Sequence, residues 1–407
     1  MRAIKIFGGG DRPTGDRRGA NAGRTSGRDA DGRLASLQAL RAVAALLVVF
    51  NHFLIIPRHV ALESELATWV LQTFVRIGSF GVDLFFTISG FVMLLSIEKR
   101  AGRNAGSKFL LGRALRILPL YLLVTGFVMF RTLSRDGHLT DGQILNSLLL
   151  LPLFDFGPYD WPVLGVAWSL MYEFVFYLIV GAALAAGVTQ RIGWIVGTTI
   201  ALPVLGRIVG LDQSDWVVAR VMTSPMMLEF AAGSLIYIAW RRDLLRGILP
   251  SLRWLAILAP VPIVWAGLSD VVDISLSGTF IDGNRTAAWM RTIGWGVPAA
   301  LLFTLALGWQ PDRKRIVPRA MLALGDASYS LYLIHVTLIS TTVRHLVHWP
   351  PAMLVPTILA LCVGSSLIVY HFVERPLNLA SKRLSSRRRR AWSVDDPEAL
   401  GPNTRIA

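Results

Sequence analysis

Hydrophobic residues run through this chain in long stretches separated by short polar segments, a pattern typical of proteins that cross a membrane repeatedly. About 18 to 25 apolar residues suffice to span the hydrocarbon core as a helix. A further apolar run at 144–156 is too short to span, so we expect it to re-enter the membrane or lie at its surface. The pattern predicts about ten spans, at 35–56, 70–97, 117–134, 161–187, 192–210, 216–239, 247–268, 290–310, 321–346 and 351–373.

Composition supports lipid as the main solvent of the fold. Of the 407 residues, 53% are hydrophobic and 16% are charged, and the mean hydropathy is +0.52, too apolar for a soluble protein of this length. We therefore expect an all-α polytopic membrane protein whose membrane domain covers 34–380, with no appended soluble domain. The arginine-rich segments 1–33 and 381–407 are expected to be disordered tails.

The distribution of positive charge predicts the orientation of these helices. Connections at 99–116, 241–253 and 313–319 hold four to six Lys or Arg each, more than the loops between them. By the positive-inside rule these connections and both termini are cytoplasmic. The net charge of +15 therefore indicates topology, and we expect no nucleic-acid partner.

The first span carries a cation and a histidine on one face. Arg41 and His52 are eleven residues apart, or three helical turns plus about 20°, which separates them by roughly 16 Å along the axis. Arg41 is predicted at the cytoplasmic end and His52 in the outer half, where a neutral imidazole could serve as a general base. The alternative is that Arg41 only anchors the helix and His52 is an interfacial histidine.

Two carboxylates are predicted at bilayer depth, where ionisable groups are costly and are functional candidates by default. Asp83 falls in the outer half of the second span, with His52 as its expected partner. Glu173 falls about halfway through the fourth span and is expected to face the same cavity as His52 and Asp83. Small residues further along the second span, including Ser89, could instead serve close helix packing.

Arginine, hydroxyl and histidine side chains complete the candidate site. Arg113 and Arg116 lie one turn apart at the cytoplasmic start of the third helix and suit phosphate oxygens, although membrane anchoring also explains them. His335 competes with His52 as the base or orients a substrate. We expect no bound metal and no permanently bound cofactor. The residues predicted to bind or orient an acceptor are Ser89, Tyr172, Ser328, Tyr332 and His335.

These stretches together resemble the membrane-bound acyltransferase 3 family, whose members O-acylate bacterial surface and exported polysaccharides. The resemblance covers about residues 34–380. The stretches 37–42 and 168–173 look most like the branch that acetylates exopolysaccharides such as succinoglycan. The motifs that carry the resemblance to the family as a whole are Arg41 with His52, residues 80–91, Arg113 with Arg116, residues 168–173, and residues 328–335.

The resemblance implies an O-acyltransferase of the bacterial inner membrane that moves an acyl group, by default acetyl, from cytoplasmic acyl-CoA to a polysaccharide, lipopolysaccharide or lipid-linked sugar. It implies that His52 is essential. Our own hypothesis from the residues is that Asp83 or Glu173 stabilises the imidazolium when His52 acts as the base. It also implies that Arg41, Arg113 and Arg116 serve the acyl-CoA. The bilayer and polysaccharide biosynthesis proteins are the partners expected.

Two other classes of function stay open on the residues alone. A transporter or flippase would use the buried charges as a relay, and it predicts broken helices in matching halves of the chain, which the sequence does not reveal. A non-catalytic subunit of a polysaccharide export complex would not need His52. No serine sits in a nucleophile-elbow pattern, and both direct transfer and a covalent acyl-enzyme remain compatible with the sequence.

Overall fold

Helices form all of the regular structure that can be described. Within the described residues no strand occurs, and seven helices are long and apolar enough to cross a membrane, or eight if one bent pair is a single span. This confirms the all-helical, multi-pass architecture. The count of ten stays a prediction, because the expected span 247–268 lies outside the described residues. The computed structural model describes residues 35–58, 65–98, 100, 102, 104–135, 137–150, 162–187, 190–245, 285–308 and 318–380.

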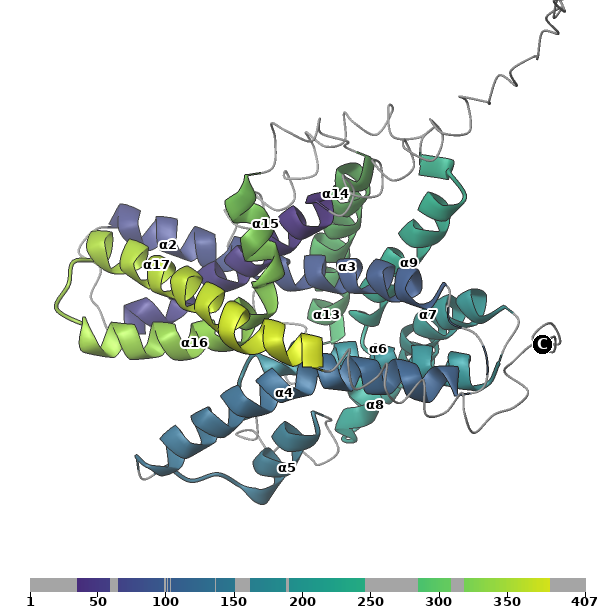
Figure 1. The fold of residues 1–407 in the computed structure, drawn as a ribbon, viewed down its shortest axis with the longest axis horizontal. Coiled ribbons are helices and arrows are strands. Elements are labelled where there is room, and N and C mark those ends of the chain that lie inside the picture. The colour runs from purple at the N-terminus through teal and green to yellow at the C-terminus, as the bar shows by residue number, and fades with distance from the viewer. Residues whose placement is uncertain are drawn as a thin grey trace, which may run out of the picture.

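The helices follow one another along the chain with short interruptions (Figure 1). The apolar helix Ala35–Asn51 comes first and continues into the 3-10 helix η1 (His52–Arg58). The elements after it are α2 (Glu65–Gly78), α3 (Phe80–Ile97), α4 (Ala105–Leu133), α5 (Asp141–Leu149), α6 (Ala167–Ala185), α7 (Arg191–Val209), η2 (Leu211–Gln213), α8 (Val217–Met222), α9 (Met227–Arg241), α13 (Arg285–Arg291), the π-helical η3 (Thr292–Gly296), α14 (Val297–Gly308), α15 (Arg319–Asp326), α16 (Ser328–His345), α17 (Pro351–Val369) and the π-helical η4 (Tyr370–Glu374).

Two predicted spans differ from the observed helices. The third helix, α4, begins at Ala105 rather than at 117, so Arg113 and Arg116 lie within the helix and not at its start. The ninth span is broken, because α15 and α16 meet at a 76° bend around Ala327. Of the short apolar run at 144–156, α5 accounts for the first part and residues 151–161 lie outside the described residues.

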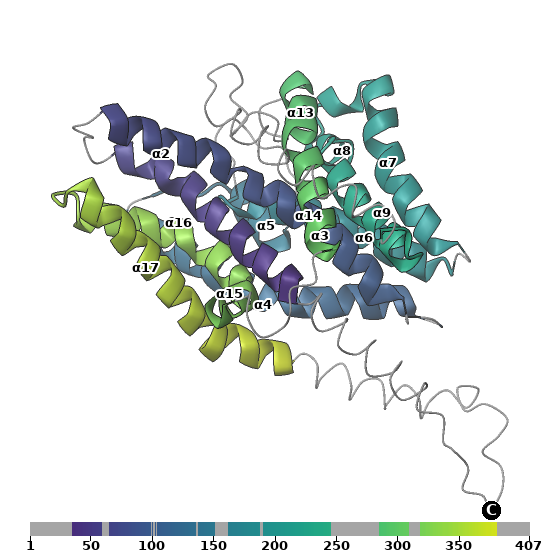
Figure 2. The same cartoon turned by 90° about the horizontal axis from the view of Figure 1, so that it is seen from above.

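The first helix packs between two groups of helices. Figure 2 shows Ala35–Asn51, in dark purple, lying between α3 on one side and α16 with α17 on the other. Glycines permit close approaches by α3 and α15, since a Cβ at Gly81 on α3 would lie 2.4 Å from the Ala44 carbonyl oxygen and one at Gly325 on α15 would lie 2.1 Å from that of Gln38. The helix that carries Arg41 and leads into His52 is therefore held by neighbours on more than one side.

The central helix is α3, of whose 18 residues 13 are buried. It packs against α9 with almost no space between the two backbones. A Cβ at Gly90 would lie 2.1 Å from the Phe230 carbonyl oxygen, and a Cβ at Gly233 would lie 1.9 Å from that of Thr87. Small residues allow this kind of close approach between membrane helices, where van der Waals packing drives association.

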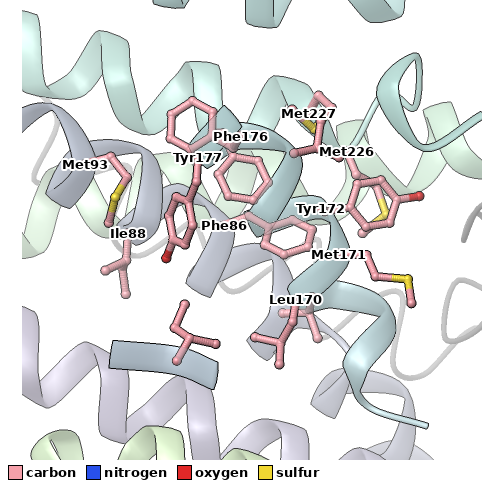
Figure 3. Packing of buried hydrophobic residues seen from close by; sticks show 14 of the residues in the cluster. Phe86, Ile88, Met93, Leu170, Met171, Tyr172, Phe176, Tyr177, Met226 and Met227 are labelled. Carbon is pink, nitrogen blue, oxygen red and sulfur yellow. The ribbon is translucent and has the colours of Figure 1, made fainter. Parts of the chain in front are cut away.

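Aromatic side chains extend this contact toward α6. Phe86 stacks on Phe230 with ring centroids 4.5 Å apart, and Phe176 stacks on the same ring at 4.8 Å. Figure 3 shows Phe86, Phe176, Tyr172 and Tyr177 in this cluster. The rings join α3, α6 and α9 into one rigid unit, which carries one wall of the site described below.

Outer helices present apolar side chains to the surroundings, as a lipid-facing surface requires. On α4 these exposed side chains include Leu123, Phe127 and Phe130. On α17 they include Met353 and Ile368. These exposed apolar side chains are what the lipid-facing surface of a multi-pass protein requires.

The close contact of α3 and α9 predicts a steric effect at Gly233. Replacing Gly233 with Ala pushes the new methyl group into the Thr87 backbone, and overpacking of this kind costs about 1–3 kcal/mol. Gly126→Ala on α4 is the matched control, because nothing lies within 4 Å of a Cβ there. Thermal unfolding can be followed by labelling the buried Cys362 thiol as it becomes exposed. We expect Gly233→Ala alone to lower the melting temperature, and equal melting temperatures would contradict the packing described.

Candidate active site

A pocket with about 850 Å³ of empty space opens among the first helix, α3, α4, α6 and α16. Its wall combines basic, acidic and hydroxyl-bearing side chains with aromatic rings. The polar residues that line it are Arg41, Ser89, Arg113, Arg116, Ser169, Glu173, Tyr177, Ser328, Tyr329 and Tyr332. Most of the polar residues singled out in the sequence therefore meet at one place, although they come from five segments of the chain.

Three arginines gather at this pocket, as the sequence suggested. Arg41 comes from the first helix, and Arg113 and Arg116 come from α4. The Arg113 guanidinium lies over the Phe109 ring, 5.4 Å from its centroid, and 5.9 Å from the centroid of Tyr177. Such cation–π contacts orient a guanidinium while leaving its N–H groups available. The arrangement suits an anion with several negative charges, such as a phosphorylated ligand.

Glu173 belongs to the arginine end of the pocket. Its Oε1 accepts hydrogen bonds from the Ser89 hydroxyl at 2.9 Å and from the Tyr177 hydroxyl at 2.5 Å. We expected Glu173 to share a cavity with His52 and Asp83, but neither of those residues lines this pocket. The two hydroxyl groups hold the carboxylate toward the arginines, whose charge balances its own.

His52 pairs with His335 in the structure. The His52 Nδ1 lies 2.9 Å from the Val48 carbonyl oxygen and 3.1 Å from His335 Nε2. On the other side of the second ring, His335 Nδ1 lies 3.1 Å from the Leu331 carbonyl oxygen. The His335 side chain is fully buried, and the two rings meet edge to face with centroids 4.7 Å apart. The candidates that competed for the role of base are therefore neighbours.

This contact geometry assigns the hydrogens of the two neutral rings. A carbonyl oxygen only accepts, so His335 Nδ1 carries a hydrogen and donates it to Leu331. The His335 Nε2 of a neutral ring is then an acceptor, and His52 Nδ1 donates to it and to Val48. This leaves the lone pair of His52 Nε2 free to take a proton. His335 thus orients the His52 ring, and the groups at His52 Nδ1 are His335 and Val48 rather than Asp83 or Glu173.

Tyr332 links the pocket to the histidine pair. It lines the pocket, and it stands one helical turn before His335 on α16, with ring centroids 6.0 Å apart. Its hydroxyl donates to the Val166 carbonyl oxygen at 2.8 Å and accepts from the Ser169 hydroxyl at 2.5 Å. The arginine pocket and the histidine pair are therefore neighbours along α16, where Tyr332 lines the pocket and His335 contacts His52.

Asp83 has a different partner from the one expected. Its Oδ2 accepts a hydrogen bond of 2.8 Å from Arg291 Nη2, and both side chains are buried. The expected pairing with His52 is therefore wrong. Arg291 was not among the residues predicted from the sequence, although a charged residue within a predicted span is the signal that marks such partners.

Of the remaining predicted residues, one lines the pocket and one is buried outside it. Ser328 is buried and lines the pocket, whereas Tyr172 is buried outside it, against Phe86 and Trp168. Two residues that the sequence analysis did not single out, Ser169 and Tyr177, line the pocket and bond to its polar groups. Among the described residues no group of three or more His, Cys, Asp or Glu could hold a metal ion.

Comparisons with known proteins point to one family. Residues 34–371 match the model of a family described as an acyltransferase domain. The chain is 30% identical over 312 residues to the exopolysaccharide production protein ExoZ of Rhizobium meliloti (strain 1021), which covers 74% of this chain and 90% of that protein. It is 27% identical over 399 residues to the acyltransferase MdmB of Streptomyces mycarofaciens, covering 90% and 96% respectively. No solved structure matches the chain.

The three arginines predict that the pocket binds a compact polyanion. Inorganic pyrophosphate is a suitable probe, and its affinity for the purified protein can be measured by calorimetry. Arg116→Gln should weaken binding about tenfold or more, because it removes a charge-assisted contact. Arg207→Gln on α7 is the matched control, since Arg207 pairs with Asp212 at 3.7 Å and does not line the pocket. Equal affinity in both variants would show that the pocket is not the anion site.

Proposed function

The chain belongs to the acyltransferase 3 family, and from that premise we propose that this multi-pass membrane O-acyltransferase acylates a hydroxyl of an exported or surface polysaccharide or glycolipid. The proposed donor is cytoplasmic acyl-CoA and the proposed acyl group is acetyl. Similarity to a protein named for exopolysaccharide production supports a sugar polymer as acceptor. The proposed location is the bacterial inner membrane, with polysaccharide biosynthesis proteins as partners and no permanently bound cofactor.

The observation that carries this proposal is the placement of the polar groups. Three arginines and Tyr332 line the pocket, and His335, which contacts His52, follows Tyr332 one turn further along α16. Acyl-CoA carries phosphate groups, which guanidinium groups bind well, and its thioester lies at the far end of a flexible arm. An acyl group delivered past the arginines would therefore approach the free nitrogen of His52.

The proposed chemistry needs one base that first removes a proton and then returns it. His52 Nε2 takes the proton of the acceptor hydroxyl as the oxygen attacks the thioester carbonyl carbon. The C–O bond forms, the C–S bond breaks, and the departing CoA thiolate takes the proton from the imidazolium. While His52 is charged, the Val48 carbonyl and the lone pair of His335 Nε2 stabilise its Nδ1–H. Direct transfer by this route needs no covalent acyl-enzyme.

Hydroxyl-bearing residues of the wall are proposed to orient the reactants. Ser89 and Tyr177 hold Glu173, which balances the arginines. Ser328 and Tyr332 face the same pocket and can hydrogen-bond to a substrate oxygen. This mechanism gives no part to Asp83, which pairs with Arg291, or to Tyr172, which packs against Phe86 and Trp168.

One feature of the fold is compatible with the rival function, a transporter that uses broken helices. Among the described residues one apolar pair, α15 with α16, is bent sharply at a short break. A transporter built on inverted repeats would need a matching break in the other half of the chain. Membership of an acyltransferase family favours the enzyme, and the bend places Ser328 at the pocket.

The proposed role of His52 predicts that the polysaccharide of a His52→Ala strain loses an ester that the wild type carries. A positioned general base contributes roughly 10²–10⁴ in rate, so the ester should fall below a few per cent of the wild-type content. The ester is measured by NMR on purified polysaccharide at equal polymer yield.

Variants at two other histidines serve as controls for this test. His345→Ala changes an exposed histidine at the end of α16 and should leave the ester unchanged. His335→Gln keeps an acceptor for the His52 Nδ1–H and should retain more ester than His335→Leu, which removes it. Full ester content in the His52→Ala strain would overturn the assignment of the base.

A further inference from the structure

A second group of ionisable side chains lies away from the pocket, where α3, α9 and α13 meet. Asp83 comes from α3, Glu229 from the first turn of α9, and Arg291 from the last turn of α13. Their exposed fractions are 0%, 1% and 1%, so all three are sealed from the surroundings. Figure 1 shows the segment from α13 to α14 crossing α3, which brings these residues together from distant parts of the chain. The acyl transfer proposed above does not use them.

The arginine and one carboxylate form an ion pair. Arg291 Nη2 donates to Asp83 Oδ2 at 2.8 Å and lies 3.3 Å from the Ser79 carbonyl oxygen. Asp83 and Arg291 therefore balance each other. This leaves Glu229 as a third ionisable group in the same enclosed space.

Glu229 is placed against this ion pair and not beside a cation of its own. Its carboxyl group lies against the carboxyl group of Asp83, within hydrogen-bonding reach. Gly296 of η3 also lies against Glu229, since a Cβ there would come within 2.9 Å of Glu229 Cγ. The absence of a side chain at Gly296 makes room for the glutamate in this position.

Three of the four oxygens of this carboxyl pair lack a hydrogen donor in the described part of the chain. Among the described residues, neither Oε1 nor Oε2 of Glu229 has a hydrogen-bond partner, and neither does Oδ1 of Asp83. Two ionised carboxylates that face each other repel, and neither can donate. A proton on one of them supplies the missing donor and removes the repulsion at once.

Counting charge leads to the same result. Within the part of the chain that the structure describes, the charged groups that act on the two carboxyls are each other and Arg291. If both carboxyls were ionised, the cluster would keep a net negative charge in the interior of a membrane protein, where an uncompensated charge is costly. With one proton bound the cluster is neutral.

We propose that Asp83, Glu229 and Arg291 form a charge-neutral lock that holds a single proton between its two carboxyl groups. Glu229 carries the proton and donates it to Asp83, whose other oxygen binds Arg291. The lock joins α3 to α9 and to the segment from α13 to α14. Because α3 also carries Ser89 into the pocket, the lock fixes the position of one pocket wall.

The requirement is for one negative charge beside Arg291, whichever carboxyl provides it. Asp83→Asn leaves Glu229 to ionise and pair with Arg291, and Glu229→Gln leaves the Asp83–Arg291 pair intact. Each single variant should therefore melt within a few degrees of the wild type. The double variant Asp83→Asn/Glu229→Gln removes both carboxyl groups that face the buried Arg291 and should melt at least about 10 °C lower. Adding Arg291→Met should recover most of that loss.

These variants are compared as full-length protein in detergent, with unfolding followed by labelling of the buried Cys362. The uncharged double variant Thr87→Val/Ser234→Ala changes buried polar residues of the same two helices and should cost much less. The lock is refuted if either single variant is as unstable as the double. It is also refuted if the double variant matches the singles, or if the triple variant recovers nothing.

Infrared spectroscopy gives a readout that does not depend on stability. The carbonyl stretch of a protonated carboxylic acid lies apart from that of a carboxylate, and a buried acid keeps this band when the pH is raised to about 8. We expect a component of the band to disappear in Asp83→Asn and equally in Glu229→Gln, because either change leaves one ionised carboxylate. If neither variant removes intensity, the two carboxyls do not hold a proton.

Discussion

The interior of a membrane protein has no water to stabilise charge, so every ionic side chain there needs a counter-charge or hydrogen-bond donors. In this chain the constraint is met in three ways. Glu173 receives two hydroxyl hydrogen bonds beside arginines, Asp83 binds Arg291, and the two histidines are neutral and bond to each other and to backbone carbonyls. The arrangement of helices follows from the need to bring these partners together.

One helix, α3, contributes a residue to each of two polar clusters, the pocket and the ion pair with Arg291. Ser89 faces the pocket and bonds to Glu173, whereas Asp83 points to the other side and binds Arg291. The two residues are six positions apart, which places them about 120° from each other around the helix. When α3 is placed so that Asp83 binds Arg291, the depth and direction of Ser89 are therefore set as well. Stability and pocket shape depend on the same element.

The sequence predicted the helices and the gathering of the arginines, because apolar length and charge position are local signals. It did not predict partners: Asp83 was assigned to His52 because the two lie at similar depth, whereas helix packing brings Arg291 to it. Glu229 and Arg291 lie within predicted spans and could have been found by the same rule that found Glu173. The bend before Ser328 and the early start of α4 depend on tertiary contacts, which a hydropathy pattern does not contain.

The central claim is that the donor binds at the arginine side while the acceptor is used near the histidine pair toward the opposite side. The most direct measurement uses proteoliposomes in which the protein has one known orientation, labelled acetyl-CoA is added only on the cytoplasmic face, and a polysaccharide acceptor is enclosed on the other. We predict that label appears in the enclosed acceptor and that adding pyrophosphate on the cytoplasmic face slows the transfer. Labelling that occurs only when donor and acceptor share one compartment would contradict this account.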